Sequence, residues 1–189
     1  MAAARPAALA QAADGQATRA RWVGLVASAR VGDRAAFSAL HDQFCGMVHG
    51  VIISRVRPSD APDLVQDVFL TAMQKLATLE DDAAFPGWLA QLARHRAAHH
   101  LRDHPAHDEL SDQLPGASGF DEAPDARKVL AALRTLPEAY RETLAMRLIE
   151  GLTGPEISEL TGLTPGSVRV NLHRGMQLLR EKLQWRVPE

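Results

Sequence analysis

Hydrophobic side chains recur at steps of three and four residues along most of the chain, which is the period of one face of an α-helix. The pattern is clearest in residues 153–183, where two helical stretches flank a short break at Gly162. The second stretch opens with Thr164, a good N-cap, and Pro165 suits the first helical position. Its apolar face carries Val168, Leu172, Met176, Leu179 and Leu183, and its polar face carries Ser167, Arg169, Asn171, His173, Arg174 and Arg180.

Two helices joined by a tight glycine-containing turn, with the second apolar on one side and basic on the other, are typical of a DNA-binding helix-turn-helix. A plain helical hairpin in an all-helical protein has the same spacing, so the pattern alone leaves this alternative open. The choice between the two depends on what the rest of the chain contains.

The same periodicity predicts further helices before this pair. One begins near Trp22, a second is long and strongly apolar on one side, a third covers residues 59–79, and a fourth starts within residues 85–88. Two more follow from residue 126 onward. The residues expected to start or stop these helices are Gly32, Asp33, Pro58, Ser59 or Asp60, and Pro137.

No stretch alternates as a β-strand does, so we expect an all-α fold. Residues 1–18 are rich in alanine and are interpreted as a disordered N-terminal arm. Residues 105–125 hold prolines, glycines, serines and acids without periodicity, which predicts a flexible linker. The chain is therefore expected to form two small helical domains, residues 19–104 and 126–184, the second ending in the helix-turn-helix.

Composition narrows the function classes. The net charge is −2 and the pI about 6.4, so any nucleic-acid binding must come from a local basic face. No apolar run approaches the length of a membrane span, and we expect a cytoplasmic protein. Cys45 is the only cysteine, which excludes an internal disulfide and fits a reducing compartment.

Two further faces carry charge. The predicted helix over residues 59–79 leaves Asp60, Asp63, Gln66 and Asp67 outside its apolar side, although a charge run of this kind is often only a solvated surface. The helix that starts near residue 85 can place Arg94, Arg96, His99 and Arg102 on one polar face. The chain thus combines one acidic helix with two basic ones.

Taken in order, these segments resemble a group IV, or extracytoplasmic-function (ECF), sigma factor of the sigma-70 family. The likeness runs from about residue 20 to 184 through the segments GDRAAFSALHDQF, DAPDLVQDVFLTAMQKL, FPGWLAQLARHRAAHHLRD and the stretch from LRTLPEAYRETL to LLREKL. The resemblance identifies residues 19–104 as sigma domain 2 and residues 126–184 as sigma domain 4.

The resemblance implies a factor that binds core RNA polymerase and promoter DNA, and that an anti-sigma factor controls. It implies core-polymerase binding by Asp60, Asp63, Gln66 and Asp67. It implies binding of the −10 element by Phe85, Trp88, Arg94, His95, His99 and Arg102, with residues 78–85 forming a pocket for unpaired bases. It implies binding of the −35 element by Thr164, Ser167, Arg169, Asn171, His173 and Arg174. No cofactor or metal is expected.

The chain departs from the family pattern at three places. Pro62 stands where the acidic set usually has a glutamate, and a proline is acceptable in a first helical turn. His95 and His99 replace the usual asparagine and aspartate of the −10 helix. Asn171 stands where an arginine is frequent in the recognition helix. The last two departures bear on which promoter is recognised.

Other interpretations account for less of the chain. His95 and His99 lie one helical turn apart, a spacing that can bind zinc, but no cysteine lies nearby. A two-domain regulator that binds duplex DNA without polymerase has no need of the acidic helix, and a sigma-like decoy has no need of the basic recognition face. An enzyme lacks support, because no nucleophile–base pair, phosphate loop or metal-ligand set is apparent in the sequence.

The predicted linker also bears on how the two domains are arranged. A flexible tether gives no reason, visible in the sequence, for the domains to stay fixed to each other. The opposite charges and apolar faces nevertheless make a compact arrangement of the free chain plausible, with each domain covering part of the other.

Overall fold

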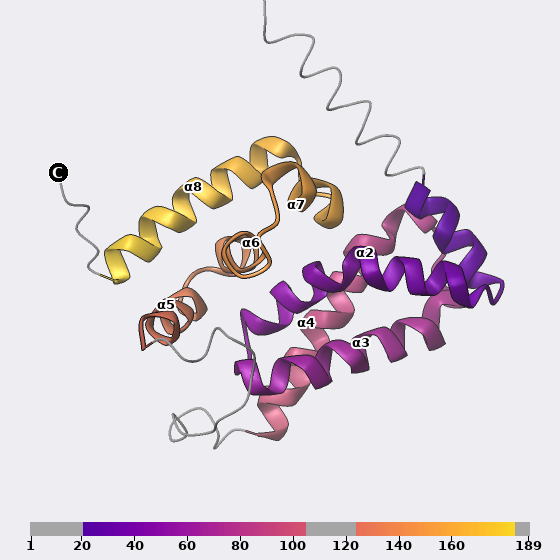
Figure 1. Ribbon diagram of the computed structural model, residues 1–189, viewed down its shortest axis with the longest axis horizontal. Helices are drawn as coiled ribbons and strands as arrows, with labels where there is room; N and C mark the ends of the chain where they lie inside the picture. Colours follow the sequence, from indigo (N-terminus) through magenta and orange to yellow (C-terminus); the bar gives the residue numbers. More distant parts are fainter. Residues whose placement is uncertain (1–20, 105–123, 184–189) are drawn as a thin grey trace, which may run out of the picture.

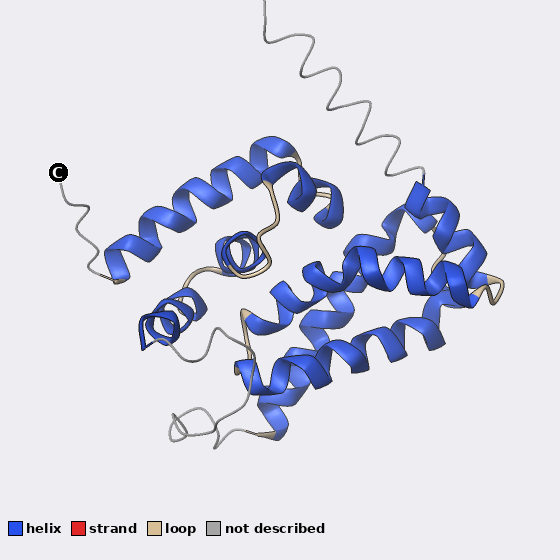
Figure 2. Cartoon of the chain, in the orientation of Figure 1, coloured by secondary structure: helices blue, strands red, loops and turns tan. Residues whose placement is uncertain are grey.

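The computed structural model describes residues 21–104 and 124–183, and within these ranges the chain forms helices and turns without any strand (Figures 1 and 2). A first helix covers residues 21–30. Three long helices follow: α2 (Arg34–Ile53), α3 (Ala61–Lys75) and α4 (Phe85–Asp103). Short 3-10 turns at Pro58–Asp60, Leu76–Thr78 and Asp82–Ala84 join them. The second group comprises α5 (Pro124–Arg134), α6 (Glu138–Leu148), α7 (Gly154–Thr161) and α8 (Pro165–Lys182).

This arrangement confirms the all-α fold with two helical domains, the second ending in a helix-turn-helix. The predicted arm, residues 1–18, lies outside the described residues. So does the predicted linker, residues 105–125, except that α5 already begins at Pro124. None of the described helices is long and apolar enough to span a membrane.

Local signals set most helix boundaries. Asp33 caps α2 by accepting hydrogen bonds from the backbone N–H of Ala35 at 2.9 Å and of Ala36 at 3.1 Å. The preceding Gly32 has φ 98°, a left-handed conformation that ends the first helix. The expected cap of α3 is wrong: Asp60 occupies the N-cap position without capping, because its carboxylate binds Arg57 and His100 instead.

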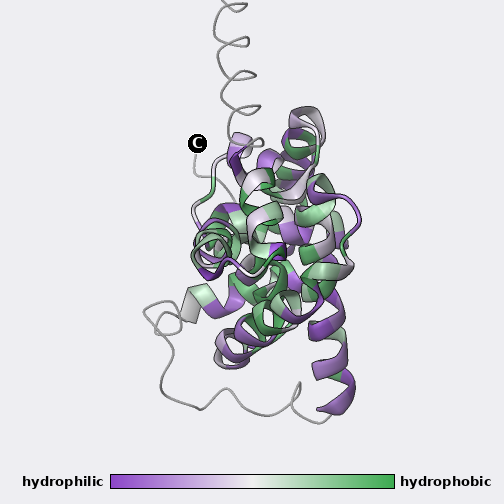
Figure 3. Cartoon of the chain, turned by 90° about the vertical axis from the view of Figure 1, so that its right-hand side faces the viewer, coloured by the Kyte–Doolittle hydropathy of each residue, from purple (hydrophilic) through white to green (hydrophobic). Residues whose placement is uncertain are grey.

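The core of the first group of helices, which the sequence predicts to be domain 2, lies where the first helix, α2, α3 and α4 face one another, and hydrophobic residues (green) gather there in Figure 3. Phe44 of α2 is fully buried and contacts two aromatic rings edge-on, Trp22 at 5.9 Å and Phe85 at 5.2 Å between centroids. Edge-to-face pairs of this kind add specific geometry to the burial of apolar area. Phe85 therefore anchors the start of α4 in the core.

Helix α6 is the centre of the second group of helices, which the sequence predicts to be domain 4, and it makes much of the contact with the first group. It lies between α8 on one side and α2 on the other (Figure 1). Every residue from Glu142 to Met146 is buried, which a helix covered on one side only does not show. At the α8 contact, Gly175 allows close approach, since a Cβ there would lie 2.9 Å from Leu144 Cδ1 and 3.1 Å from Tyr140 Cβ.

The two domains are thus packed together where α6 meets α2 and where α7 meets α2 and α4, which we call the closed arrangement. A compact form was expected as one possibility, but the expectation that nothing in the sequence fixes the domains to each other is wrong. Gly50 of α2 sits against Met146 of α6, and charged side chains pair across the contact. Residues far apart in the sequence make these contacts.

Candidate DNA and polymerase interfaces

The helix-turn-helix is built from local polar contacts. Thr153 and Glu156 form a capping box at the start of α7, with the Thr153 N–H donating to the Glu156 carboxylate at 2.7 Å. Gly162 ends α7 with φ 73°, in the left-handed region that glycine accepts without strain. Thr164 then caps α8 by accepting from Ser167 N–H at 3.1 Å, as expected.

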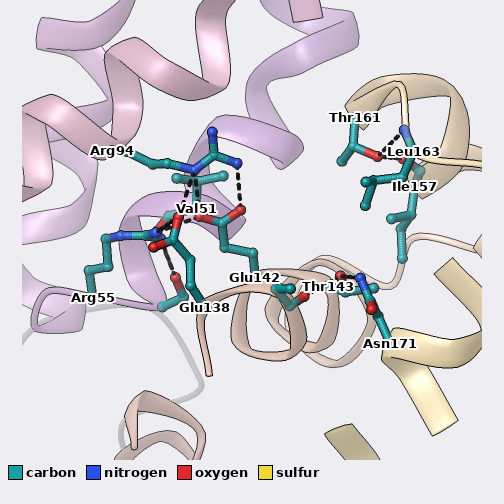
Figure 4. Close-up of polar contacts among 12 residues, drawn as sticks. Val51, Arg55, Arg94, Glu138, Glu142, Thr143, Ile157, Thr161, Leu163 and Asn171 are labelled. Carbon is teal, nitrogen blue, oxygen red and sulfur yellow. Dashed lines mark hydrogen bonds and ion pairs between the residues drawn. The ribbon is translucent and has the colours of Figure 1, made fainter. Parts of the chain in front are cut away.

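The turn between the two helices is tied down by side chains. Ser158 Oγ donates to the carbonyl oxygen of Leu163 at 2.6 Å. Leu163 N–H donates to Thr161 Oγ1 at 3.3 Å (Figure 4). Buried Ile157 and Val168 hold the apolar sides of α7 and α8 in the core of the domain. The orientation of α8 relative to α7 is therefore held by the buried side chains and by the hydrogen bonds of the turn.

The outer face of α8 is basic and open to solvent. Arg169, His173 and Arg174 are exposed, and Val170 retains 45% of its surface. Arginine pairs with guanine O6 and N7 in a major groove, and residues near the start of a recognition helix are best placed to do so. Thr164 and Ser167 are also exposed, but their side chains already take part in the cap.

Asn171 was predicted to address DNA, yet its side chain turns toward α6. Its amide Nδ2 donates to Thr143 Oγ1 at 3.4 Å, and the residue is half-buried (Figure 4). An amide held in this way cannot at the same time point outward from α8. Arg169 and Arg174, by contrast, are exposed on α8.

The acidic set on α3 divides into paired and unpaired members. Asp63 and Gln66 are exposed. Asp67 accepts from Arg96 at 2.9 Å and 2.5 Å, which links α3 to α4. Burial alone would raise the pKa of Asp60, but hydrogen bonds from His100, Arg57 and Ser59 outweigh it and the pKa is lowered. Asp60 is thus a stable anion with partners inside the domain.

An apolar groove adjoins this acidic set. It has a volume of about 240 Å³ and is lined by side chains of α2 and α3, including Pro62, Gln66, Phe69, Leu70 and Met73. Leu70 is 46% exposed and Met73 is 53% exposed, which is high for large apolar residues. Acidic and apolar side chains therefore lie next to each other on one side of domain 2.

The predicted −10 set is spread over different environments. Phe85 is fully buried, with Trp88 beside it at 5.9 Å between ring centroids and half-buried. His95 is exposed and bonds Gln91 at 2.9 Å, while Arg102 is exposed at the far end of α4. The remaining two members are paired with carboxylates: His99 with Asp103 at 2.6 Å, and Arg94 with Glu142. The loop in front of α4 is tethered by an ion pair between Asp82 and Arg30.

Sequence reasoning did not find the cluster formed by Arg55, Arg94, Glu138 and Glu142, which we call the Arg–Glu cluster (Figure 4). Arg94 donates to Glu142 from Nε at 2.9 Å and from Nη2 at 2.8 Å, and Arg55 pairs with the same carboxylate at 2.5 Å. Burial would raise the pKa of Glu142, but the hydrogen bond from Arg94 and the charges of both arginines lower it. The hydrogen bond to Glu142 raises the pKa of Arg94 in turn.

Glu142 stands between Arg141 and Thr143 in the sequence, so it does not interrupt an apolar stretch and nothing local marks it as a buried charge. Its partners lie 48 or more positions earlier in the chain, so no local pattern reveals the pairing. Among the described residues, no group of three or more histidine, cysteine or acidic side chains is arranged to hold a metal ion.

Two domain models match the chain in the order in which the structure presents them. The model of Sigma-70 region 2 matches residues 40–106, and the model of Sigma-70, region 4 matches residues 126–179. The helical domain formed by α2, α3 and α4 and the helix-turn-helix domain are therefore those of a sigma factor.

Curated relatives extend over both domains. The chain is 32% identical to the RNA polymerase sigma factor CarQ of Myxococcus xanthus over 161 residues, which is 82% of this chain and 92% of CarQ. It is 27% identical to the ECF RNA polymerase sigma-E factor of Haemophilus influenzae, over 85% of this chain and 94% of that protein. The protein belongs to the ECF, or group IV, sigma factors of the sigma-70 family. This membership decides against a regulator that acts without polymerase.

Solved structures share the fold. CnrH, solved in complex with the cytosolic domain of CnrY, matches with a TM-score of 0.55 and 21% identity over 86% of this chain and 96% of that one. The sigma factor RpoE of Bartonella quintana, solved in complex with the anti-sigma factor NepR, matches with a TM-score of 0.50 and 20% identity over 80% of this chain and 98% of that one.

Proposed function

We propose that this ECF sigma factor binds core RNA polymerase in the cytoplasm, recognises −35 and −10 promoter elements, and promotes promoter melting and initiation. It acts by binding and not by catalysis. The observation that carries the proposal is that both sigma-70 regions are present, with an acidic face on α3 and a basic face on α8 both exposed.

Core polymerase binding is assigned to the side of domain 2 where Asp63 and Gln66 are exposed beside the apolar groove. The carboxylate gives orientation and speeds association with a basic partner, whereas the exposed Leu70 and Met73 supply apolar area to bury. Asp60 and Asp67 are paired within the domain, so each gives up a partner there if it is to meet a basic group of polymerase.

Recognition of the −35 element is assigned to α8. Arg169 reads bases near the start of the helix, and Arg174 and His173 lie on the same exposed face. Arg180, near the end of α8, contacts phosphate and positions the helix without reading sequence.

Recognition of the −10 element is assigned to α4 and the loop before it. Unpaired bases have to be held out of the stack, at a cost of a few kcal/mol that stacking and edge contacts offset. Arg102 faces solvent and is available for such contacts, whereas the exposed His95 and His99 give up their contacts with Gln91 and Asp103 to make them. Trp88 is half-buried nearer the start of the same helix. Phe85 supports the loop from within the core.

Control by an anti-sigma factor is part of the proposal. It is supported by two proteins of the same fold, one solved with a partner named as an anti-sigma factor and the other with the cytosolic domain of CnrY. A partner that covers domains 2 and 4 together would compete with polymerase for the exposed faces of α3 and α8.

The test is a fluorescence titration of the full chain with purified core polymerase. Asp63→Arg is expected to weaken binding clearly while circular dichroism shows an intact helical fold. Glu181→Arg makes the same charge change at an exposed position of α8 and serves as the matched control. If Asp63→Arg binds core polymerase as tightly as the wild type does, the assignment of this face is wrong.

A further inference from the structure

We propose that the closed arrangement is an autoinhibited form of the free chain, held by the Arg–Glu cluster, in which Glu142 of domain 4 occupies two arginines of domain 2. The inhibitory role rests on the proposed function, because Arg94 belongs to the helix assigned to the −10 element. The holding role does not, since it concerns only how the two domains of the free chain are attached.

The geometry of the cluster is that of an anion-binding site already filled. Arg94 engages Glu142 with two parallel N–H donors, at 2.9 Å and 2.8 Å, the fork geometry that guanidinium groups also use for phosphate. Arg55 approaches the same carboxylate from the other side at 2.5 Å. Glu142 therefore stands where a DNA phosphate would stand if Arg94 contacted the promoter backbone.

Because the Arg55–Glu142 pair is buried, its loss should destabilise the closed arrangement. The side chains of Arg55 and Glu142 are each only 9% exposed, so neither charge is well hydrated while the domains are closed. Glu138 adds a second carboxylate near both arginines, at 3.0 Å from Arg55 and 3.2 Å from Arg94, but its side chain is 57% exposed. Removing one partner of a buried pair leaves an uncompensated charge, which strongly disfavours the closed arrangement.

The backbone of α2 is shaped for this contact independently of the charges. A Cβ on Gly50 would lie 2.8 Å from Met146 Cγ and 3.4 Å from the Met146 backbone, and a Cβ on Gly46 would lie 3.5 Å from the Glu150 carboxylate. Two glycines one turn apart thus let α6 approach α2 closely. Outside the closed arrangement these glycines only weaken α2, because glycine is a poor helix former.

Two more polar contacts cross the same interface. His49 of α2 pairs with Glu150 at 2.5 Å, and Arg134 of α5 donates to the carbonyl oxygen of Val56. The contact is therefore anchored at several points on α2 and the loop that follows it. Full separation of α2 from domain 4 therefore breaks these contacts together with the Arg–Glu cluster.

The first experiment locks the closed arrangement with a disulfide. The Cβ of Glu150 lies 3.9 Å from a Cβ built on Gly46, which is within the range that disulfides span. Gly46→Cys with Glu150→Cys, in a Cys45→Ala background, should crosslink under mild oxidation. Transcript yield from a randomised promoter library with purified core polymerase should fall by roughly tenfold or more and return on reduction. Cys45→Ala alone, treated with the same oxidant and reductant, is the control.

Each outcome of the locking experiment is informative. Failure of the two cysteines to crosslink would show that α2 and the turn after α6 are not adjacent in the free chain. Equal transcript yield from the crosslinked and reduced protein would show that closure does not inhibit. Either result overturns the proposal.

The second experiment measures closure without polymerase or DNA. Donor and acceptor dyes are placed on the exposed positions Ala98 of α4 and Gln177 of α8 through cysteine substitutions in the Cys45→Ala chain. Glu142→Gln should lower energy transfer by shifting the closed-to-open ratio at least roughly tenfold. Glu181→Gln, on the exposed side of α8, should leave it unchanged.

An energy transfer that Glu142→Gln leaves unaltered would contradict the holding role of the Arg–Glu cluster. This readout needs no sigma activity. It therefore distinguishes an Arg–Glu cluster that does not hold the domains together from a proposed function that is wrong. If the reduced double-cysteine variant and its control both fail to transcribe, the proposed function is at fault, and the energy-transfer result still decides whether the cluster closes the chain.

Discussion

At the scale of single residues, the polar side chains of this protein divide into those that have partners within the chain and those directed to solvent. Asp67, Arg94 and Asn171 have partners, in Arg96, Glu142 and Thr143 respectively. Asp63, Arg169 and Arg174 are exposed. The exposed side chains can contact polymerase or DNA without breaking a bond within the protein. The side chains with partners have to give up those bonds first.

An arginine of α8 that contacts bases and one that contacts phosphate should differ in how their replacement changes DNA binding. Arg169→Ala is expected to relax base preference at one −35 position by about 1–3 kcal/mol, the worth of a good bidentate base contact. Arg180→Ala should lower affinity evenly across sequences and reduce the salt slope by about one. The measurement is a selection of −35 sequences by the holoenzyme at two salt concentrations. A selected −35 element unaffected by Arg169→Ala would mean that the reading face of α8 has been misplaced.

Protonation of Glu142 at low pH should change the free energy of unfolding. Its pKa is lowered below the ordinary 4.5, since the arginines outweigh burial. A carboxyl with a depressed pKa in the folded state stabilises that state above its unfolded pKa, and the contribution disappears as the pH falls through the folded value. The stability difference between wild type and Glu142→Gln should therefore be full above about pH 5 and shrink below about pH 4.

Urea denaturation between neutral and acidic pH tests this expectation. Glu138→Gln is the matched control, because its carboxyl reaches the same arginines from a side chain that is 57% exposed, and the loss should be smaller. A stability difference for Glu142→Gln that stays constant across the whole range would contradict a buried, ionised Glu142.

At the scale of elements, the sequence predicted what depends on neighbours in the chain. Thr164 and Asp33 were recognisable as caps because the N–H groups they bind lie within three residues. The cap assigned to Asp60 was wrong because His100, 40 positions away, takes its carboxylate. Helix periodicity therefore revealed the elements and most of their ends, but not which polar groups would be claimed by distant partners.

The candidate sites show the same limit. The basic face of α8 could be read from residue spacing, since solvent covers it. The role of Phe85 was not readable, because its burial depends on Phe44 and Trp88 together. For α6, periodicity assumes a single covered face, while the structure covers it from both α8 and α2. The Arg–Glu cluster lies on the side of α6 that faces the first domain, which the periodicity did not reveal.

Close packing of α8 on α6 should depend on Gly175. Gly175→Ala places a methyl group 2.9 Å from Leu144 and 3.1 Å from Tyr140, and the overpacking costs about 1–3 kcal/mol. The better helix propensity of alanine offsets up to about 1 kcal/mol, so a net loss of about 1 kcal/mol is expected in thermal unfolding. Gly24→Ala is the control, because no atom lies within 4 Å of the added methyl group and stability should rise. Equal stabilisation by both substitutions would contradict the packing described for α8.

At the scale of the whole molecule, a net charge of −2 conceals a separation of charge. Acidic side chains lie on α3 beside an apolar groove, and basic ones cover the outside of α8. The same chain thus offers one surface to a basic protein and another to DNA. In the closed arrangement both surfaces belong to a single compact body, which a second protein can cover at once.

An anti-sigma partner should therefore need both domains. A pull-down from the native host with the full chain is expected to retain a protein that domain 2 or domain 4 alone retains less well. Purified core polymerase should displace this protein. If polymerase is the only protein that the full chain retains, control must lie elsewhere.

The central claim, that this chain is a promoter-selecting subunit of RNA polymerase, is tested most directly by transcription in a defined system. Purified core polymerase is incubated with a randomised promoter library, with and without the full chain under reducing conditions, and the transcribed DNA is sequenced. The account predicts that the chain directs initiation at templates sharing one upstream and one downstream element, and that Arg169→Ala alters the upstream element. Transcription that is no more abundant and no more selective than that of core polymerase alone would contradict it.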